Sequence, residues 1–243
     1  MGFFIDSKID KNLRALNAKF KDFPLGKDKL PDLTIELVPE ESSLRFLKPL
    51  KSINEYSFYK VDDGFLISMN DNFLHLNKDA TSAKIYCPEG DPYKKQFYMG
   101  YLLMHAYKYT MISNGGFIIH ASTAVYKNSC ICFCGLSGAG KSTQTSLWKE
   151  NLNTWSINFD QPCIFSENGR YFAHGSPWSG KEELLRNCFC PIEAIVFVQQ
   201  SKENSVQKLS AVEAFSLLYL NNYVYPFSPE FEQQYTENIK NMI

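Results

Sequence analysis

The sequence predicts a mixed α/β fold in two parts, a β-rich region over residues 1–92 and an α/β domain over residues 93–243. Short alternations of apolar and polar residues before residue 88 predict strands and hairpins in the first part. A helical pattern over residues 93–114, followed by two glycines, opens the second part. Within it, an apolar run over residues 130–134 leads directly into a glycine-rich loop and a helix, which predicts a P-loop core.

Five segments of the N-terminal region carry the strand pattern. They cover residues 33–38, 56–61, 64–69, 73–76 and 83–87. Asp62, Asp63 and Gly64 join the second and third segments with a composition typical of a β-hairpin. We therefore expect a meander, although its role is not readable from these residues.

The composition bounds the compartment and the class of partner. The 243 residues carry a formal net charge of −1, which offers no electrostatic attraction to nucleic acid or an anionic membrane, so we expect neither as a partner. None of the seven cysteines belongs to a C-x-x-C pair, and free thiols favour a reducing compartment. There is neither an apolar run of about 18 residues nor a signal peptide, so we expect a cytoplasmic protein.

Two strands of the α/β domain, over residues 117–125 and 130–134, flank the tight turn 127–129. Because a hairpin reverses the chain, it brings His120 back toward the loop that follows the second strand.

Cys130, Cys132 and Cys134 alternate along the second strand, so their side chains point to the same face. We expect them to be small buried hydrophobic residues, with a metal or redox centre as the alternative.

Further elements follow the glycine-rich loop. We expect a helix over residues 143–150, a buried strand over 155–160, a hairpin of 163–165 and 171–173, a strand over 192–198, and helices from 209 and over 229–243. Ser210 and Glu213 have the spacing of a capping box, which marks the start of the first of these two C-terminal helices.

The loop after residue 134 fits the phosphate-binding pattern G-x-x-x-x-G-K-[ST] at every fixed position. The residues that we expect to bind a nucleotide are Gly135, Leu136, Ser137, Gly138, Ala139, Gly140, Lys141, Ser142 and Thr143. The glycines let consecutive backbone N–H groups point at one anion. Lys141 supplies positive charge for the β- and γ-phosphates, the Ser142 hydroxyl can ligate magnesium, and the positive end of the next helix adds to the attraction.

Other candidate residues have two interpretations. Asp160 ends a predicted strand, where a carboxylate can hold the metal or its water, but it is alternatively a turn residue before Pro162. The segment 175–181, rich in Gly, Ser and Pro, either closes over a ligand or is a plain connection. His105 is expected to be a helix-face residue rather than a ligand.

The chain resembles the HPr kinase and ATP-dependent phosphoenolpyruvate carboxykinase superfamily at His120-Ala121-Ser122, at the stretch 133–142 and at Asp160. A histidine precedes the loop, as in the carboxykinases, and Asp160 follows Lys141 by 19 residues, where both families place an acidic residue at a strand end. The resemblance covers about residues 115–200. It is closest to the small HPr-kinase-like proteins, some of which phosphorylate serine on peptides or proteins.

This resemblance implies an ATP-dependent kinase that uses Mg²⁺, or alternatively Mn²⁺, and phosphorylates a serine-like hydroxyl on a peptide, protein or small molecule. It implies catalytic roles for Lys141, Asp160 and His120, with Asp160 as the candidate base. Ser142, Asp160 and His120 would lie at the metal, although His120 is alternatively an ordinary strand histidine. Arg186 or Lys181 could neutralise charge on the transferred group.

Two other functions stay open. One is an ATP-binding regulatory module that transfers nothing, and the other is a minimal phosphoenolpyruvate carboxykinase-like enzyme. Since the related kinases are commonly oligomeric, a homo-oligomer is a further expectation.

Overall fold

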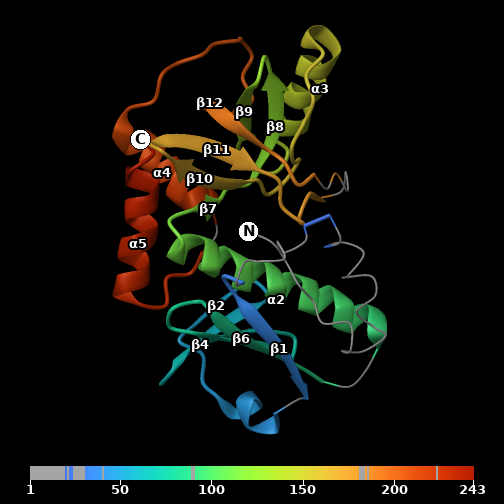
Figure 1. Ribbon diagram of the computed structural model, residues 1–243, viewed down its shortest axis with the longest axis vertical. Helices are drawn as coiled ribbons and strands as arrows, with labels where there is room; N and C mark the ends of the chain where they lie inside the picture. The colour runs from blue at the N-terminus through green and yellow to red at the C-terminus, as the bar shows by residue number, and fades with distance from the viewer. Residues whose placement is uncertain are drawn as a thin grey trace. The chain divides into compact units, whose positions relative to one another are not determined.

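The computed structural model describes residues 20, 22, 23, 31–39, 41–88, 91–180, 184, 186–222 and 224–243. Within these residues the structure has two mixed six-stranded sheets and four α-helices, which confirms the predicted α/β class (Figure 1). Lys181, which was considered as a charge-neutralising residue, lies outside the described residues.

The chain forms two compact units. The first contains Met1–Asn114 and Val224–Glu232, and the second contains Gly115–Tyr223 and Gln233–Ile243. We expected the division after residue 92, but it lies after Asn114. The reason is that helix α2 (Pro92–Ser113) contacts β4, β5 and β6 of the N-terminal sheet, so it is part of the first unit.

The sheet of the first unit is a meander with one added strand. Its strands are β1 (Thr34–Pro39), β2 (Lys51–Ile53), β3 (Tyr56–Val61), β4 (Gly64–Met69), β5 (Asn72–Asn77) and β6 (Ser82–Cys87), with a 3₁₀ helix η2 (Ser42–Phe46) after β1. Their order is β1-β6-β5-β4-β3-β2, antiparallel except that β1 runs parallel to β6. All five predicted strands are confirmed. Strand β2 was not predicted because its three residues are too few to carry a pattern.

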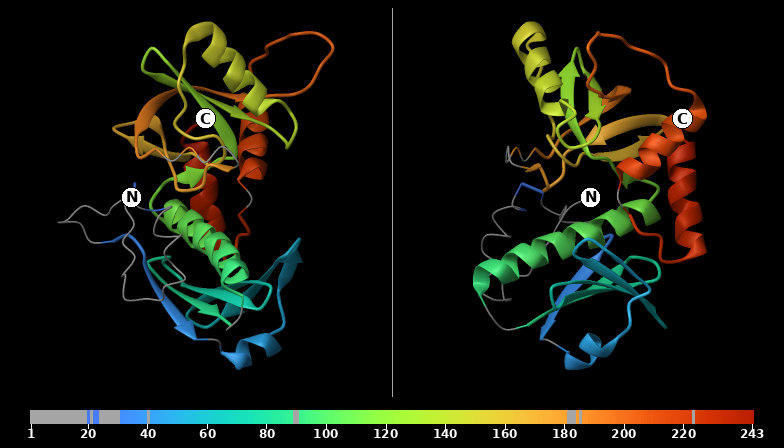
Figure 2. Two further views of the ribbon diagram at one scale, coloured as in Figure 1. Left: turned by 90° about the vertical axis from the view of Figure 1, so that its right-hand side faces the viewer. Right: turned by 180° about the vertical axis from the view of Figure 1, so that it is seen from behind.

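Helix α2 covers one face of this sheet (Figures 1 and 2). The Asp91 carboxylate caps its start by accepting the Tyr93 N–H at 2.9 Å. Gly115 follows its end with a φ of +80°, the left-handed conformation that glycine adopts without strain. The start and end predicted for this helix are therefore confirmed to within one residue.

Segment 224–232 joins the first unit through aromatic contacts. Phe227 stacks on Phe65 with 3.6 Å between ring centroids, and the Tyr109 hydroxyl donates a hydrogen bond to the Tyr225 carbonyl at 2.7 Å. Aromatic rings bury a large area each, so these contacts stabilise the return of the chain to this unit.

The second unit contains the other sheet. Its strands are β7 (Phe117–Ile118), β8 (Ala121–Tyr126), β9 (Ser129–Cys134), β10 (Cys163–Glu167), β11 (Arg170–His174) and β12 (Phe189–Phe197), in the order β7-β10-β11-β12-β9-β8. The predicted hairpins β8–β9 and β10–β11 are confirmed. Strands β9 and β12 run parallel, so their carboxyl ends meet at one edge of the sheet.

Helix α3 (Lys141–Leu152) packs against β8 and β9 (Figure 2). Helix α4 (Ala211–Asn221) begins with the predicted capping box, in which Ser210 and Glu213 each accept the backbone N–H of the other. Helix α5 (Pro229–Lys240) begins in the first unit, and its later residues belong to the second. There the Tyr235 ring lies 5.0 Å from that of Tyr219 on α4.

The strand predicted over residues 155–160 is wrong, because this segment makes only an isolated β-bridge. The segment does run beside β8, where the Thr123 N–H donates to the Asn158 carbonyl at 3.0 Å. The N–H groups of Ile157 and Asn158, however, donate to the Thr123 hydroxyl at 2.9 and 3.0 Å. A side-chain oxygen thus replaces the backbone acceptors that a strand would use.

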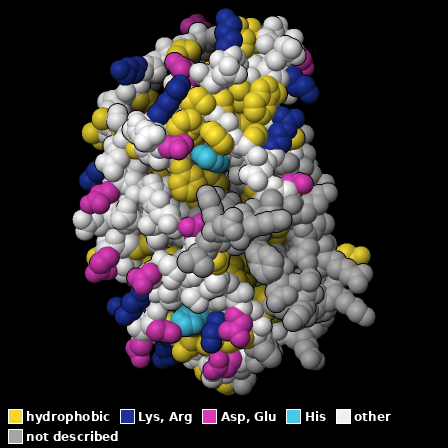
Figure 3. Space-filling view, in the orientation of Figure 1, with side chains coloured by type: hydrophobic (Ala, Val, Ile, Leu, Met, Phe, Trp, Pro, Cys, Tyr) yellow, Lys and Arg dark blue, Asp and Glu magenta, His cyan; other side chains and the backbone are white. Residues whose placement is uncertain are grey.

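All seven cysteines are thiols outside any disulfide, and Cys130, Cys132 and Cys134 are fully buried as expected. Burial raises the pKa of the Cys134 thiol to about 12. Among the described residues, no group of three or more His, Cys, Asp or Glu side chains could hold a metal ion by itself, and no helix has the length and apolar character needed to cross a bilayer. On the face shown in Figure 3, Lys and Arg side chains are interspersed with Asp and Glu.

Candidate functional site

The glycine-rich loop 135–140 connects the end of β9 to the start of α3. Gly138 and Gly140 have φ values of +80° and +107°, which only glycine adopts readily. At Gly135 a Cβ atom would lie 2.8 Å from the Val198 carbonyl oxygen, so the close approach of the residue that follows β12 also requires glycine there. The loop therefore lies at the carboxyl edge of the parallel pair β9–β12, with the N-terminus of α3 behind it.

Two contacts from the chain after β12 hold this loop. The Val198 N–H donates to the Cys134 carbonyl at 2.8 Å, and the Gln200 side-chain amide donates to the Gly138 carbonyl at 2.9 Å. The Leu136 side chain, by contrast, is 85% exposed. Such an exposed leucine at the tip of the loop is available to a ligand or to another surface.

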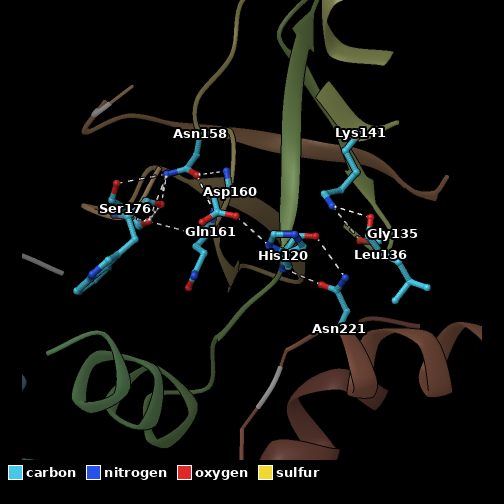
Figure 4. A network of polar contacts seen from close by, with 10 residues as sticks. His120, Gly135, Leu136, Lys141, Asn158, Asp160, Gln161, Ser176 and Asn221 are labelled. Atoms are coloured by element: carbon cyan, nitrogen blue, oxygen red, sulfur yellow. Dashed lines mark hydrogen bonds and ion pairs between the residues drawn. The ribbon is translucent and has the colours of Figure 1, made fainter. Parts of the chain in front are cut away.

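Lys141 turns its ammonium group back over the loop. Its Nζ donates to the carbonyls of Gly135 and Leu136 at 3.0 and 3.1 Å (Figure 4). Partial burial lowers the pKa of this ammonium group, while the nearby Asp160 carboxylate raises it. The Asp160 carboxylate is therefore near enough to act on the Lys141 ammonium group.

Ser142 and Thr143 lie in the first turn of α3 with exposed side chains. The contacts drawn in Figure 4 link His120, Asp160 and Lys141 to their own neighbours. The structure thus brings His120 and Asp160 into contact, whereas Lys141 bonds the loop carbonyls and the Ser142 side chain is exposed.

His120 lies between β7 and β8, and its Nδ1 is 2.9 Å from Oδ1 of Asp160. Its backbone is held by Asn221 at the end of α4. The Asn221 Oδ1 accepts the His120 N–H at 2.7 Å, and its Nδ2 donates to the His120 carbonyl at 3.3 Å. Because Asn221 satisfies both backbone groups, it fixes the histidine at a point where the sheet hydrogen bonds are interrupted.

Asp160 occupies a turn that Asn158 organises. The Asn158 Oδ1 accepts the N–H groups of Asp160 and Gln161, both at 2.8 Å. Its Nδ2 donates to the hydroxyl of Ser176 at 3.3 Å and to the carbonyl of Trp178 at 3.1 Å. The sequence analysis missed Asn158 and Asn221, and it included Ser176 only as part of the segment 175–181. The sequence offered one signal, for Asn158: an asparagine just before a turn often accepts a hydrogen bond from the backbone N–H two residues later.

The segment 175–181, described as far as Gly180, was expected either to close over a ligand or to be a plain connection. In the structure Ser176 and Trp178 are buried and bonded to the Asp160 turn, so this part of the segment forms a fixed wall of the site. Gly180, with a φ of +67°, lies directly against Asp160, and a Cβ there would be 3.1 Å from the Asp160 Cβ.

Arg186 was considered as a group that neutralises phosphoryl charge. Its Nη1 donates to the Ser156 carbonyl at 3.0 Å, and its guanidinium lies 5.4 Å from the centre of the Trp155 ring. These contacts give it a structural role in holding the segment before Asp160.

Comparison with protein families matches residues 89–240 to the family described as "SynChlorMet cassette protein ScmC". Among solved structures, the Hpr(Ser) kinase/phosphatase from Coxiella burnetii is 14% identical, with 38% of this chain and 72% of that chain covered and a TM-score of 0.28. A match at this TM-score supports neither a fold nor a function. No curated protein matches the chain.

The family match spans more than half of the chain and includes His120, the glycine-rich loop and Asp160. This chain therefore belongs to the ScmC family of SynChlorMet cassette proteins.

Proposed function

We propose that this protein is a kinase that transfers the γ-phosphoryl group of ATP, bound with Mg²⁺, to a hydroxyl group on a peptide, protein or small molecule. The observation that carries the proposal is the 2.9 Å contact between Asp160 and His120, in the same unit as the glycine-rich loop and its Lys141. Phosphoryl transfer requires a phosphate-binding loop, a cation on the phosphates and a residue that positions the acceptor. The resemblance of this sequence to HPr-kinase-like proteins supports the same conclusion.

The loop and Lys141 are suited to hold the β- and γ-phosphates. The backbone N–H groups at the start of α3 have no partners within the helix, so they are available to an anion. The Lys141 ammonium bonds two loop carbonyls, and a phosphate oxygen would be a stronger, charge-assisted partner for the same donor.

The residues at the site fit a magnesium ion. Mg²⁺ prefers oxygen ligands and takes most of them from phosphates and water, with one or two protein groups. The exposed Ser142 hydroxyl and the Asp160 carboxylate are such groups, and His120 lies against the latter. When bound, the ion would neutralise charge on the phosphates.

Asp160 is the proposed base. The acceptor hydroxyl gives its proton to the Asp160 carboxylate while its oxygen forms a bond to the γ-phosphorus. The bond from this phosphorus to the β–γ bridging oxygen breaks, and its electron pair leaves with ADP. The proton then passes from Asp160 to water. His120, with its Nδ1 2.9 Å from Oδ1, orients the carboxylate for this step.

The test is a transfer survey with γ-labelled ATP and Mg²⁺, in which the purified protein is mixed with an extract of its source cells. We expect label to move to a protein, peptide or metabolite with the wild type and to be lost with Lys141→Ala. Lys149→Ala is the matched control, because Lys149 lies on the same helix in its last turn with an exposed side chain. It should transfer label as the wild type does.

Two results would contradict the proposal. Transfer that persists in Lys141→Ala would exclude the loop as the phosphate site. ATP binding without any transfer by the wild type would instead favour a nucleotide-binding regulatory module.

A further inference from the structure

We infer that Asn158 is a positioning residue for Asp160, and that Ser176 holds the Asn158 side chain in place. The catalytic meaning of this inference rests on the proposed function, whereas the geometry that it describes does not. Asn158 is fully buried, and its Oδ1 accepts the N–H groups of both Asp160 and Gln161 at 2.8 Å. Two bonds from successive N–H groups to one oxygen fix the backbone at the residue that carries the carboxylate.

The opposite end of the same side chain is anchored in the segment after β11. The Asn158 Nδ2 donates to the hydroxyl and carbonyl of Ser176, both at 3.3 Å, and to the Trp178 carbonyl at 3.1 Å. The Ser176 hydroxyl in turn donates to the Gln161 carbonyl at 2.6 Å. These bonds close a ring that joins the Asp160 turn to the wall of the site (Figure 4).

Only a carboxamide satisfies this arrangement. The position needs an acceptor on one side and a two-hydrogen donor on the other, both within a buried environment. A fully satisfied buried network of this kind is rigid, whereas a partly satisfied one is costly. Asn158 therefore transmits the position of Ser176 and Trp178 to Asp160, and through Asp160 to the pair that it makes with His120.

A small displacement of a reacting group has a large effect on rate, about 10²-fold for about 1 Å. In Asn158→Ala the turn loses its organising acceptor, so we expect kcat for Mg·ATP turnover to fall about 10- to 100-fold. The KM for ATP should stay within about threefold of the wild type, because the glycine-rich loop is unchanged. Loss of a residue with a purely structural role would not lower kcat while leaving the KM for ATP unchanged.

The experiment has a second readout that needs no activity. The imidazole ¹⁵N resonances of the four histidines can be recorded by NMR, and that of His120 reports its contact with Asp160. The variants are Asn158→Ala and the milder Ser176→Ala, which removes only one hydroxyl. Asn72→Ala is the matched control: Asn72 is also a buried asparagine, at the start of β5, and its Nδ2 donates to the carbonyls of Met69 and Asn70 in the first unit.

We expect the His120 resonance to move in Asn158→Ala and Ser176→Ala and to stay in place in Asn72→Ala. An unmoved resonance in both site variants would overturn the inference, as would an equal shift in the control. If the resonance moves as expected while wild-type protein turns over no ATP, the positioning role stands and the proposed kinase function fails. If Asn158→Ala does not fold, Ser176→Ala alone decides by the same criteria.

Discussion

The Nδ1 atom of His120 lies 2.9 Å from Oδ1 of Asp160, although the two residues are 40 positions apart in the chain. Strand β8 connects them, because the Ala121 N–H, next to the histidine, donates to the Asp160 carbonyl at 2.9 Å. The pair is thus fixed through both backbone and side chain. This makes Asp160 the residue on which the kinase proposal can be tested most directly.

Asp160→Asn should abolish transfer and preserve nucleotide binding. An asparagine keeps an oxygen that can accept from His120, so the geometry survives, but it cannot take a proton. We expect kcat to fall at least about 100-fold, the usual contribution of a general base, with ATP affinity within about threefold. Labelled transfer and calorimetric binding of Mg·ATP measure the two quantities. Asp71→Asn, an exposed carboxylate paired with Arg45 in the other unit, is the control. Wild-type transfer rates in Asp160→Asn would remove Asp160 from the mechanism.

Gly180→Ala should disturb Asp160 by contact alone. The new Cβ would lie 3.1 Å from the Asp160 Cβ and 3.3 Å from its Cγ. Gly169→Ala has nearly the same backbone strain, with a φ of +75° against +67°, but nothing within 4 Å of its Cβ. Both substitutions should lower the free energy of unfolding by about 1–2 kcal/mol, the cost of a left-handed alanine.

Only Gly180→Ala should also slow phosphoryl transfer, because only its new methyl group meets Asp160. Chemical denaturation and the labelled-transfer assay separate the two effects. Equal transfer rates for the two alanine variants would show that Asp160 tolerates this displacement.

Thr123→Val should destabilise the second unit. Its hydroxyl accepts the N–H groups of Ile157 and Asn158, and both residues are fully buried. Valine has nearly the same shape but leaves these two donors unsatisfied, at about 1–3 kcal/mol each. We expect the free energy of unfolding to fall by about 2–6 kcal/mol. Thr123→Ser keeps the hydroxyl and should restore most of the loss. A valine variant as stable as the serine variant would mean that the segment finds other acceptors.

The elements that the sequence predicted well are those with a local cause. The alternating strands of the N-terminal meander, the capping box at Ser210 and the connection from β9 to α3 each depend on neighbouring residues. Residues 155–160 do not form the predicted strand because N–H groups of this segment bond the hydroxyl of Thr123, about thirty positions earlier. A periodic pattern within the segment cannot predict a contact with so distant a side chain.

The same reason explains which parts of the candidate site were missed. The sequence could identify Lys141 because it belongs to the phosphate-binding pattern. It could identify His120 and Asp160 because they lie at the sequence spacing from that pattern that the resembling families show. Asn158 and Asn221 are polar residues that satisfy backbone groups of other segments, and their role exists only once those segments meet. The return of residues 224–232 to the first unit is likewise a long-range aromatic contact.

His105 makes the stability of the first unit depend on pH. The sequence predicted a helix-face residue, and the structure places the side chain in the buried part of α2, with its ring 4.5 Å from that of Tyr56. Its Nε2 has no hydrogen-bond partner among the described residues. Burial, together with the positive charge of Lys108, lowers the pKa of His105 from 6.5 to about 3.

The unfolded chain therefore binds a proton on this histidine below about pH 6.5, whereas the folded chain does so only near pH 3. Between these values the unfolded state binds more protons, so stability is lost as the pH falls, by at most about 1.4 kcal/mol per pH unit from this group. His105→Phe keeps an aromatic ring and cannot titrate. Denaturant unfolding at pH 7, 5.5 and 4 should therefore show the phenylalanine variant gaining stability relative to the wild type at each step down. A constant difference across the three pH values would mean that His105 is protonated equally in both states.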